Sequence, residues 1–368
     1  MKIVIIGGHL TPALAVIEEF PKDAQILYIG RKYALEGDRA VSFEYQEVTN
    51  RKIPFKDLKT GRLQRSFTRY TIPSLLKIPI GLMQAGAILK KFKPDVVVGF
   101  GGYVSFPVIL AAFFLKLPVV IHEQTQDAGA ANRYLVRFAK KVCISFESSK
   151  KYFPSEKVVL TGNPVRKSII NPKKRFGVEI KDNTIFITGG SLGSHFINKL
   201  IMDCLPKLLD KYNVIHQAGG AEEFSDFDKL SILKEGLNKN KKDKYVVSKF
   251  FSQEEIGGIL FGSTLVVARA GINTVSELTV LNKPSLLIPI PKTQKNEQGK
   301  NALLLKKSGL CEIADQNTLG SYEFLEKINL MMKNITKYKI KDESYFNFSN
   351  AAKKIVEVIY ETAKDHSN

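Results

Sequence analysis

The sequence has no tryptophan and only three cysteines, which are Cys143, Cys204 and Cys311. These cysteines lie far apart, are odd in number and do not have the spacing of metal ligands. A disulfide framework is therefore not expected, and the usage is typical of reduced thiols in a cytosolic protein. No histidine cluster points to a metal site either, so we expect catalysis without a metal or another cofactor.

The sequence also lacks a hydrophobic run long enough to cross a bilayer. The longest apolar run, Val108–Ile121, is interrupted by Lys116 and Pro118 and falls short of the roughly 20 residues that a crossing needs. The N-terminal run Ile3–Ile6 is too short for the apolar core of a signal peptide. Any membrane contact is therefore expected to be peripheral.

Acidic residues are few, 36 against 55 basic ones, and the formal net charge is +19. Such an excess predicts an anionic partner, which would be either nucleic acid or an anionic membrane surface. A uniformly basic proteome is the alternative explanation. The length of 368 residues predicts two domains, and 44% hydrophobic residues are typical of a folded protein.

Short apolar runs rich in valine and isoleucine recur along the chain, each followed by a helical pattern. The first series comprises Ile3–Ile6, Gln25–Ile29, Asp95–Val98, Val119–Ile121, Lys141–Ile144 and Val158–Leu160, and the second Thr184–Thr188, Tyr212–His216, Lys244–Val247, Thr264–Val267 and Pro284–Ile288. Apolar strands alternating with helices indicate parallel sheets covered on both faces. Two such series predict an α/β protein with two doubly wound, Rossmann-like domains.

The boundary between the domains is expected just after Asn163, which gives domains at 1–163 and 164–345. The polar stretch Lys167–Asp182 is predicted to be a linker and Lys234–Lys244 a charged surface loop. A last helix is predicted within 346–368, because the apolar residues of Phe346–Thr362 recur at helical spacing.

Four glycine-containing turns follow predicted strands, at Gly7–His9, Gly99–Gly102, Gly189–Gly193 and Ala270–Thr274. In an open parallel sheet, ligands bind outside the carboxyl ends of the strands. Glycine lets backbone amides approach an anion, and the next helix adds its positive end. Each turn alone could serve only the change from strand to helix, but together they predict a phosphate-bearing ligand. No turn is a Walker A loop or a complete GxGxxG fingerprint.

The ordered motifs Gly7–Ala15, Gly101–Pro107, His122–Gln124, Gly162–Arg166, Gly189–Gly193, Arg269–Glu277 and Gln298–Ala302 resemble the MurG family of N-acetylglucosaminyltransferases, in glycosyltransferase family 28. The resemblance implies a GT-B fold: a cleft between an acceptor- and membrane-binding first domain and a UDP-sugar-binding second domain. It implies that the last helix packs back on the first domain. The implied reaction transfers N-acetylglucosamine from UDP-N-acetylglucosamine to undecaprenyl-linked lipid I, forming lipid II at the cytoplasmic face of the inner membrane.

The chain departs from the family pattern in three places. The first glycine loop is about three residues shorter than the family's GGTGGH, Thr125 replaces an asparagine, and Leu192 replaces a glutamine. A GT-B transferase with another glycolipid acceptor therefore stays open. A non-catalytic sugar-nucleotide-binding protein at the membrane is a further alternative, against which the joint presence of His9, Arg166 and Glu277 argues.

His9 is the residue expected to act as general base, since an ordinary histidine pKa of about 6.5 suits removal of a proton from a sugar hydroxyl. The alternative is that it only hydrogen-bonds the acceptor diphosphate. Glu123 is the second catalytic candidate, although a structural pair with His122 is an equal interpretation. His195 and His216 are expected to have no catalytic role.

By resemblance, Glu277 binds the ribose, Arg166 stabilises the diphosphate, and Gln298 and Asn301 read the sugar. Their alternatives are an exposed helical glutamate, a surface arginine and an ordinary helix N-terminus. The donor set comprises Thr125, Arg166, Gly190, Ser191, Phe251, Glu277, Gln298 and Asn301. The acceptor and diphosphate set comprises Gly7, Gly8, Thr11, Gly101, Gly102, Tyr103 and Asn132.

Membrane contact is expected at a basic and apolar stretch between Arg51 and Lys93, because basic side chains interleaved with apolar ones suit anionic lipid. Its basic residues are Arg51, Lys52, Lys56, Lys59, Arg62, Arg65, Arg69, Lys77, Lys90, Lys91 and Lys93, and its apolar ones include Phe55, Phe67, Tyr70, Ile72, Leu75, Leu76, Ile78, Ile80, Leu82 and Met83. A solvated charged face over ordinary helices is the alternative. No nucleic-acid-binding motif is recognised, so nucleic acid is not expected as the partner.

Overall fold

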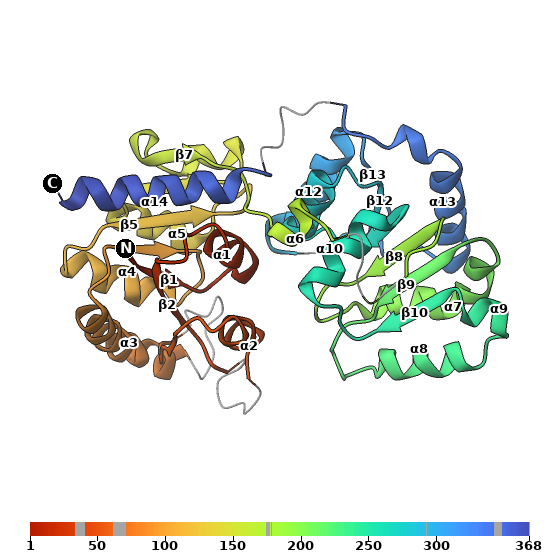
Figure 1. Ribbon diagram of the computed structural model, residues 1–368, viewed down its shortest axis with the longest axis horizontal. Coiled ribbons are helices and arrows are strands. Elements are labelled where there is room, and N and C mark those ends of the chain that lie inside the picture. Colours follow the sequence, from red (N-terminus) through yellow and green to blue (C-terminus); the bar gives the residue numbers. More distant parts are fainter. Residues whose placement is uncertain are drawn as a thin grey trace. The chain divides into compact units, whose positions relative to one another are not determined.

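The computed structural model describes residues 1–33, 41–61, 71–173, 177, 179–291, 293–341 and 348–367, and at 71–76, 294 and 367 the description is limited to the backbone. The chain forms two compact units (Figure 1). The first comprises Met1–Arg166 together with Asn347–Asn368, and the second comprises Lys167–Phe346.

The N-terminal unit is built on a seven-stranded sheet in which every strand pair is parallel, with the order β3-β2-β1-β4-β5-β6-β7. Its strands and helices are β1 Lys2–Ile6, α1 Leu10–Ile17, β2 Gln25–Gly30, α2 Phe43–Asn50, β3 Phe55–Asp57, α3 Thr71–Phe92, β4 Val96–Gly99, α4 Ser105–Phe114, β5 Val119–Glu123, α5 Ala130–Leu135, β6 Lys141–Ile144, β7 Val158–Leu160 and α14 Ala351–Ser367. Short 3₁₀ turns lie at Val136–Phe138, Glu147–Tyr152 and Ser155–Lys157.

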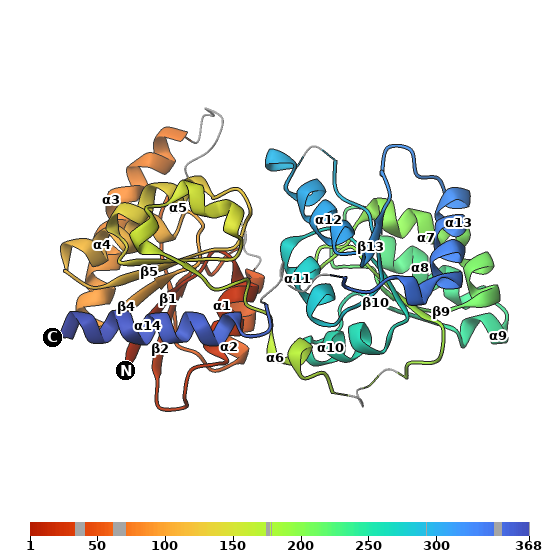
Figure 2. The ribbon, with the colours of Figure 1, turned by 90° about the horizontal axis from the view of Figure 1, so that it is seen from above.

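Strand β1 shows why this sheet needs apolar residues on both faces. Ile3 and Ile5 pack in a core with α1 and α14, whereas Val4 and Ile6 pack in a second core with α3 and α4. Successive side chains of a strand point to opposite faces, so both sets are fully buried. Helix α14 contacts α1 and strands β4 to β6, and it lies along the N-terminal unit in both views (Figures 1 and 2).

The C-terminal unit repeats this arrangement with a parallel six-stranded sheet in the order β10-β9-β8-β11-β12-β13. Its elements are α6 Lys167–Ile170, β8 Thr184–Thr188, α7 His195–Lys211, β9 Asn213–Gln217, α8 Asp226–Glu235, α9 Lys239–Lys242, β10 Tyr245–Ser248, α10 Gln253–Gly262, β11 Leu265–Ala268, α11 Ile272–Val280, β12 Ser285–Leu287, α12 Glu297–Lys307, β13 Cys311–Ile313 and α13 Ser321–Lys333, with 3₁₀ turns at Gln294–Asn296 and Ile335–Lys337. The prediction of two doubly wound parallel sheets is confirmed.

Two edge strands, β3 and β13, were not predicted from the sequence. Each is three residues long, carries a charged residue and pairs with one neighbour, so neither has the apolar run of a central strand. The predicted linker also begins differently, since α6 packs against α10 and its Ile169 is fully buried. The predicted loop Lys234–Lys244 contains the short helix α9.

Candidate active site

The four glycine turns lie in pairs where the strand order of each sheet reverses. In the N-terminal unit β1 and β4 are neighbours at this point, and in the C-terminal unit β8 and β11 are. Crevices outside the carboxyl ends of the strands at such switch points are where doubly wound sheets bind ligands. The topology therefore places the predicted turns where a ligand is expected in each unit.

In the N-terminal unit the turns after β1 and β4 touch each other. The His9 amide donates a hydrogen bond to the Phe100 carbonyl oxygen at 3.1 Å. A side chain at Gly8 would overlap the Gly101 carbonyl, and a Cβ at Gly102 would lie 2.9 Å from the Gly8 Cα. Gly101 and Gly102 also have φ values of +79° and +74°, which favour glycine. Close approach of the two turns explains these glycines without a ligand.

His9 lies beside the second turn, because a Cβ at Gly101 would be 3.3 Å from its Cδ2 atom and 3.7 Å from Asn132 Nδ2. Burial lowers the pKa of His9, and the negative charge of Glu123 partly offsets this effect by raising it. The imidazole is therefore largely neutral near pH 7, which is the form that can accept a proton. Thr11 is half-buried in the first turn of α1.

Glu123 is buried and its carboxylate accepts four hydrogen bonds. Oε1 accepts from the Thr125 amide at 3.0 Å and the Thr125 hydroxyl at 2.6 Å. Oε2 accepts from the Gly129 amide at 2.9 Å and Asn132 Nδ2 at 3.0 Å. These four donors fix the position of the carboxylate. The Thr125 hydroxyl also lies 2.9 Å from the Asp127 carbonyl, so both of these contacts of the hydroxyl are made within the N-terminal unit.

His122 is fully buried, and its Nε2 lies 3.1 Å from the Ser145 hydroxyl. Burial and the positive form of His9 together lower its pKa to about 3, and a contact with the Gly162 backbone opposes this shift. His122 is therefore neutral at physiological pH and supports β5. Asn132 links it to the site, since Nδ2 donates to the His122 carbonyl at 3.0 Å as well as to Glu123.

Tyr103, which was predicted in the acceptor set, has the Arg31 guanidinium over its ring at 5.2 Å. Arg31 was not predicted, because it follows β2 without a glycine motif. Arg166 is half-buried and is the last residue assigned to the N-terminal unit before α6.

In the C-terminal unit the turn after β8 presents two predicted donor residues, Gly190 and Ser191, at the surface. The Gly190 amide donates to the Thr188 hydroxyl at 3.0 Å, and the Ser191 carbonyl accepts from the Gly220 amide at 3.1 Å. Ser194 then caps α7, since its hydroxyl accepts from the Ile197 amide. The turn is thus held from both sides while its outer residues stay accessible.

Gln217, at the end of β9, was missed although it joins two predicted donor residues. Its Nε2 donates to the Gly190 carbonyl and the Thr188 hydroxyl, each at 3.3 Å. Its Oε1 accepts from the Phe251 amide at 3.2 Å. The Phe251 ring packs edge-on against Phe186. Nothing in the local sequence distinguishes Gln217 from another polar residue at a strand end.

The remaining donor candidates lie on α11 and α12, the helices that follow β11 and β12. Glu277 is buried on α11, with 7% of its surface exposed. Asn301 Nδ2 donates to the Ala270 carbonyl at 3.2 Å, and Gln298 Oε1 accepts from the Ile290 amide at 3.0 Å. Both side chains from α12 therefore support the loops after β11 and β12.

Arg269 is a cation beside the turn after β8 that the sequence left without a role. It donates to the Ser194 hydroxyl through Nε at 3.1 Å and Nη2 at 2.7 Å, and to the Ile288 carbonyl through Nη1 at 2.9 Å. Burial lowers its pKa to about 10, so the guanidinium is still charged at neutral pH. The glycine turn of this unit thus has a fixed positive charge next to it.

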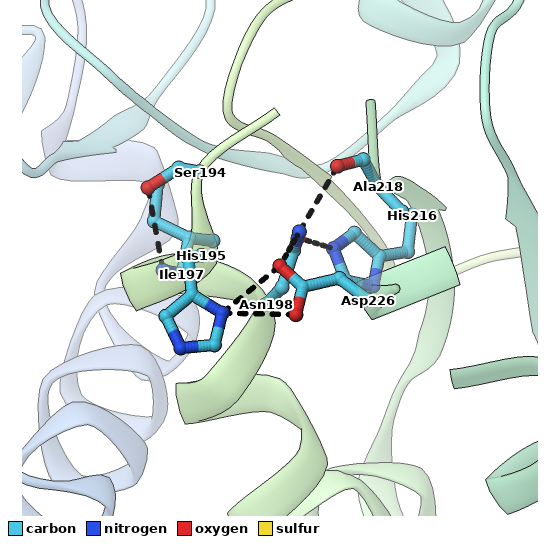
Figure 3. A network of polar contacts seen from close by, with 7 residues as sticks. All are labelled: Ser194, His195, Ile197, Asn198, His216, Ala218 and Asp226. Carbon is cyan, nitrogen blue, oxygen red and sulfur yellow. Dashed lines mark hydrogen bonds and ion pairs between the residues drawn. The ribbon is translucent and has the colours of Figure 1, made fainter. Parts of the chain in front are cut away.

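A polar network that is buried except for His195 links the start of α7 to the segment after β9 (Figure 3). His195 Nδ1 lies 2.9 Å from Asp226 Oδ1, and Asn198 Nδ2 donates to Asp226 Oδ2 at 2.9 Å and to the Ala218 carbonyl at 3.0 Å. Asn198 Oδ1 lies 3.0 Å from Nε2 of the buried His216. The network ties α7 to the loop after β9, and it gives both histidines a structural role.

Across the residues that the structure describes, no group of three histidine, cysteine, aspartate or glutamate side chains is placed to hold a metal ion. Over the same residues, none of the helices combines the length and the apolar character needed to span a membrane.

Comparison with known proteins agrees with this architecture. Residues 6–144 match the glycosyltransferase family 28 N-terminal domain, and residues 184–359 match the family's C-terminal domain. A UDP-N-acetylglucosamine–N-acetylmuramyl-(pentapeptide) pyrophosphoryl-undecaprenol N-acetylglucosamine transferase from Clostridium botulinum is 33% identical over 375 residues, 99% of each chain. A protein of the same name from Clostridium tetani is 32% identical over 378 residues, again 99% of each chain.

Among solved structures, MurG from Acinetobacter baumannii is similar with a TM-score of 0.71 and 27% identity, over 98% of this chain and 99% of that one. UDP-GlcNAc 2-epimerase from Neisseria meningitidis, with a TM-score of 0.65 and 17% identity over 98% of this chain and 100% of that one, shares the fold.

Proposed function

The chain belongs to glycosyltransferase family 28, and from this premise we propose that it transfers N-acetylglucosamine from UDP-N-acetylglucosamine to N-acetylmuramyl-(pentapeptide) pyrophosphoryl-undecaprenol. The observation that carries the proposal is similarity over 99% of both chains to transferases of this name, with both family domains matched. The activity is that of a UDP-N-acetylglucosamine-dependent N-acetylglucosaminyltransferase of the peptidoglycan precursor pathway.

The donor is assigned to the C-terminal unit. Its diphosphate would lie at the exposed turn of Gly190 and Ser191 and would contact it through Ser191, because the Gly190 amide already donates to the Thr188 hydroxyl. The N-terminal end of α7 favours an anion there, and Arg269 adds a positive charge. Glu277, Phe251, Gln298 and Asn301 complete the donor set, with Glu277 on the ribose. Arg166 and Thr125, which were predicted for the same set, belong to the other unit.

The acceptor is assigned to the N-terminal unit, where His9 serves as the general base. Neutral His9 takes the proton from the 4-hydroxyl of the N-acetylmuramyl sugar as that oxygen attacks the anomeric carbon of the donor. The bond from this carbon to the UDP oxygen breaks, UDP departs with the electron pair, and the configuration inverts. Arg166 and the Gly189–Gly193 turn would stabilise the charge on the departing diphosphate.

Glu123 supports this step through its charge. The proton converts His9 to an imidazolium, and the Glu123 carboxylate is the charge that favours this form. The four hydrogen bonds to Glu123 occupy both of its oxygens, so His9 rather than Glu123 is assigned as the base. Its catalytic role is thus to hold Asn132 and Thr125 in place and to stabilise protonated His9.

Peripheral contact with an anionic membrane, at the cytoplasmic face, belongs to the same proposal. On helix α3 Ile80 and Met83 are 56% and 75% exposed, and Lys90, Lys91 and Lys93 are exposed at and just after its end. Exposed apolar and basic side chains together support docking on anionic lipid. Residues 62–70 of the predicted stretch, with Arg62, Arg65, Phe67, Arg69 and Tyr70, lie outside the described residues, as do the side chains of Ile72, Leu75 and Leu76.

A transfer assay tests the function directly. The protein is mixed with UDP-N-acetylglucosamine and a short-chain analogue of the undecaprenyl acceptor, and the product is identified by mass. One added N-acetylhexosamine per acceptor, with an equal amount of UDP released, is the expected result. UDP-glucose and an acceptor without the N-acetylmuramyl sugar are the controls. UDP binding without transfer would leave a sugar-nucleotide-binding protein and overturn the proposal.

A further inference from the structure

The first glycine turn was expected to bind the acceptor diphosphate, but its backbone amides have partners within the protein. The Gly7 amide donates to the Ile29 carbonyl at 2.9 Å, and the His9 amide donates to the Phe100 carbonyl at 3.1 Å. The Gly8 amide, between them, lies beside the carboxylate of Glu44 and lowers its pKa. An anion can use the amides of a glycine turn only where they are unoccupied. Two of the three amides are occupied by carbonyl oxygens, and the third lies against the Glu44 carboxylate.

Glu44 reaches the turn from the first turn of α2. Its Oε1 accepts from the Tyr28 hydroxyl at 2.8 Å, and its Oε2 accepts from the Arg31 amide at 3.2 Å. The carboxylate thus binds two donors at and just after the end of β2 and lies beside the amide that follows β1. It has the acceptors and the charge that a bound phosphate oxygen would otherwise bring to these amides.

The glycines around Glu44 make room for this carboxylate. A Cβ at Gly7 would overlap Glu44 Oε1, and a Cβ at Gly30 would lie 2.6 Å from Oε2. Gly7 follows β1 and Gly30 ends the neighbouring β2, and neither has a positive φ that would require glycine for backbone reasons. Their lack of side chains is explained by the buried carboxylate.

Helix α2 is itself held so that Glu44 points at the turn. The Ser42 hydroxyl accepts from the Tyr45 amide at 3.1 Å and donates to the Arg31 carbonyl. Tyr45 packs edge-on against Phe55, which stacks on Tyr28. The residues that bind Glu44 are therefore fixed by the same contacts that fix α2.

We propose that Glu44 is a positioning residue, an internal anion that fills the first glycine turn and thereby holds His9 in its catalytic place. The turn then does not bind the acceptor diphosphate. Among the predicted acceptor residues, the amides of Gly101 and Gly102 have no partner in the part of the chain that the structure describes, and the diphosphate contact falls to them.

The pKa of Glu44 is raised above its ordinary value, because the cost of burial exceeds the stabilisation by its neighbours. Burial raises its pKa, whereas the Tyr28 hydroxyl, the amides of Arg31 and Gly8 and the Arg31 charge lower it. A carboxylate that is costly to bury and is nevertheless held by several donors is typical of a residue that serves a specific function at its site. Its removal would leave the Arg31 amide and the Tyr28 hydroxyl without this acceptor.

The inference rests on the proposed transferase function for its activity readout, so the test also includes a binding readout. Glu44→Ala is compared with the wild type and with Glu147→Ala, which removes an exposed carboxylate of the same unit. For Glu44→Ala we expect kcat to fall about 10- to 100-fold, as for a displaced catalytic group. The KM for UDP-N-acetylglucosamine should stay within about twofold, because the donor is assigned to the other unit.

Adding formate then distinguishes the loss of a positioning carboxylate from a general loss of structure in Glu44→Ala. The cavity left by Glu44→Ala should accept formate, which would restore part of kcat and raise the melting temperature of this variant. Neither the wild type nor Glu147→Ala should respond. The melting shift does not need turnover, so it tests the internal anion even if the wild type proves inactive and the proposed function fails.

Two results would overturn the inference: turnover of Glu44→Ala within twofold of the wild type, or a loss of turnover with no response to formate in either readout. If Glu44→Ala does not fold, Glu44→Gln replaces it. The amide keeps the shape and the contact with Tyr28 but offers one acceptor fewer, so kcat should fall about tenfold with the donor KM unchanged. Unaltered kcat in this variant would equally contradict the proposal.

Discussion

The side-chain nitrogen of Asn132 lies 3.0 Å from the carboxylate of Glu123, and Asn132 also donates to the carbonyl of His122. The Asn132 amide thus bonds both the backbone of β5, at His122, and the Glu123 carboxylate, whose charge raises the pKa of His9. In the part of the chain that the structure describes, Asn132 Oδ1 is buried and accepts no hydrogen bond. The candidate active site is therefore organised around a carboxylate that is held in place by a neighbouring amide.

Replacing Glu123 by glutamine should shift the pH dependence of catalysis. The charge of Glu123 raises the pKa of His9, so its loss should lower that pKa further. The acidic limb of kcat/KM, which reports protonation of the base in the free enzyme, should move to lower pH. The new amide would also face the donors Gly129 and Asn132, which we expect to cost about 1–3 kcal/mol of stability. An acidic limb that stays at the same pH would show that the charge of Glu123 does not act on the pKa of His9.

Removal of the imidazole tests the base itself. His9→Ala should lower kcat by about 10²–10⁴-fold, the usual contribution of a positioned general base, and abolish the acidic limb. Affinity for UDP-N-acetylglucosamine should barely change. His366→Ala, at the exposed end of α14, is the matched control and should retain full turnover. A loss of only a few fold with the limb intact would make Glu123 the next candidate for the base.

The donor assignment predicts a specific loss of binding. Glu277→Ala should weaken UDP-sugar binding by about 1–2 kcal/mol in calorimetry, because a carboxylate contact to the ribose is removed. Glu323→Ala, which removes a half-exposed carboxylate from α13 in the same unit, should bind as the wild type does. Equal affinity of both variants would exclude Glu277 from the site.

Membrane docking predicts a charge-dependent affinity. Binding to anionic vesicles should fall steeply as salt is added and be absent on neutral vesicles. Changing Lys90, Lys91 and Lys93 to glutamate should abolish it. The same change at the exposed Lys333, Lys337 and Lys339 of the other unit alters the net charge equally and should leave most of the binding. Equal loss in both triple variants would indicate attraction by net charge alone.

The buried His216 predicts a loss of stability in mild acid. Burial lowers its pKa to about 3, although Asp226 opposes the shift, whereas an unfolded histidine has a pKa of about 6.5. Between these values the unfolded state binds a proton that the folded state does not, so the unfolding free energy falls as the pH falls. The expected loss is about 2 kcal/mol at pH 5.

The dependence of the unfolding free energy on pH is measured by urea unfolding at several pH values, with hydrogen exchange of the β8 and β9 amides as the probe. His216→Gln, which has no proton to gain, should show a smaller dependence on pH between 7 and 5 than the wild type. Parallel slopes in the two proteins would assign the acid sensitivity to other groups.

The sequence by itself determined the two sheets and the places of their ligand turns. A strand buried on both faces must be apolar throughout, as Ile3–Ile6 and Val96–Val98 are, so such strands are visible as uninterrupted runs. The sequence likewise shows glycine at positions where two turns touch, as at Gly8 and Gly101, so the turns themselves could be predicted. The full-length order of motifs was enough to predict the family.

Only the tertiary structure decided which polar groups satisfy one another at those turns. Glu44 occupies the first glycine turn, and Gln217 joins Gly190 to Phe251, through contacts between residues far apart in the sequence. Thr125 was predicted to face the donor, yet its hydroxyl is bonded to Glu123. A hydrogen bond depends on the distance and direction between two atoms, and these are set by the packing of whole elements rather than by local sequence.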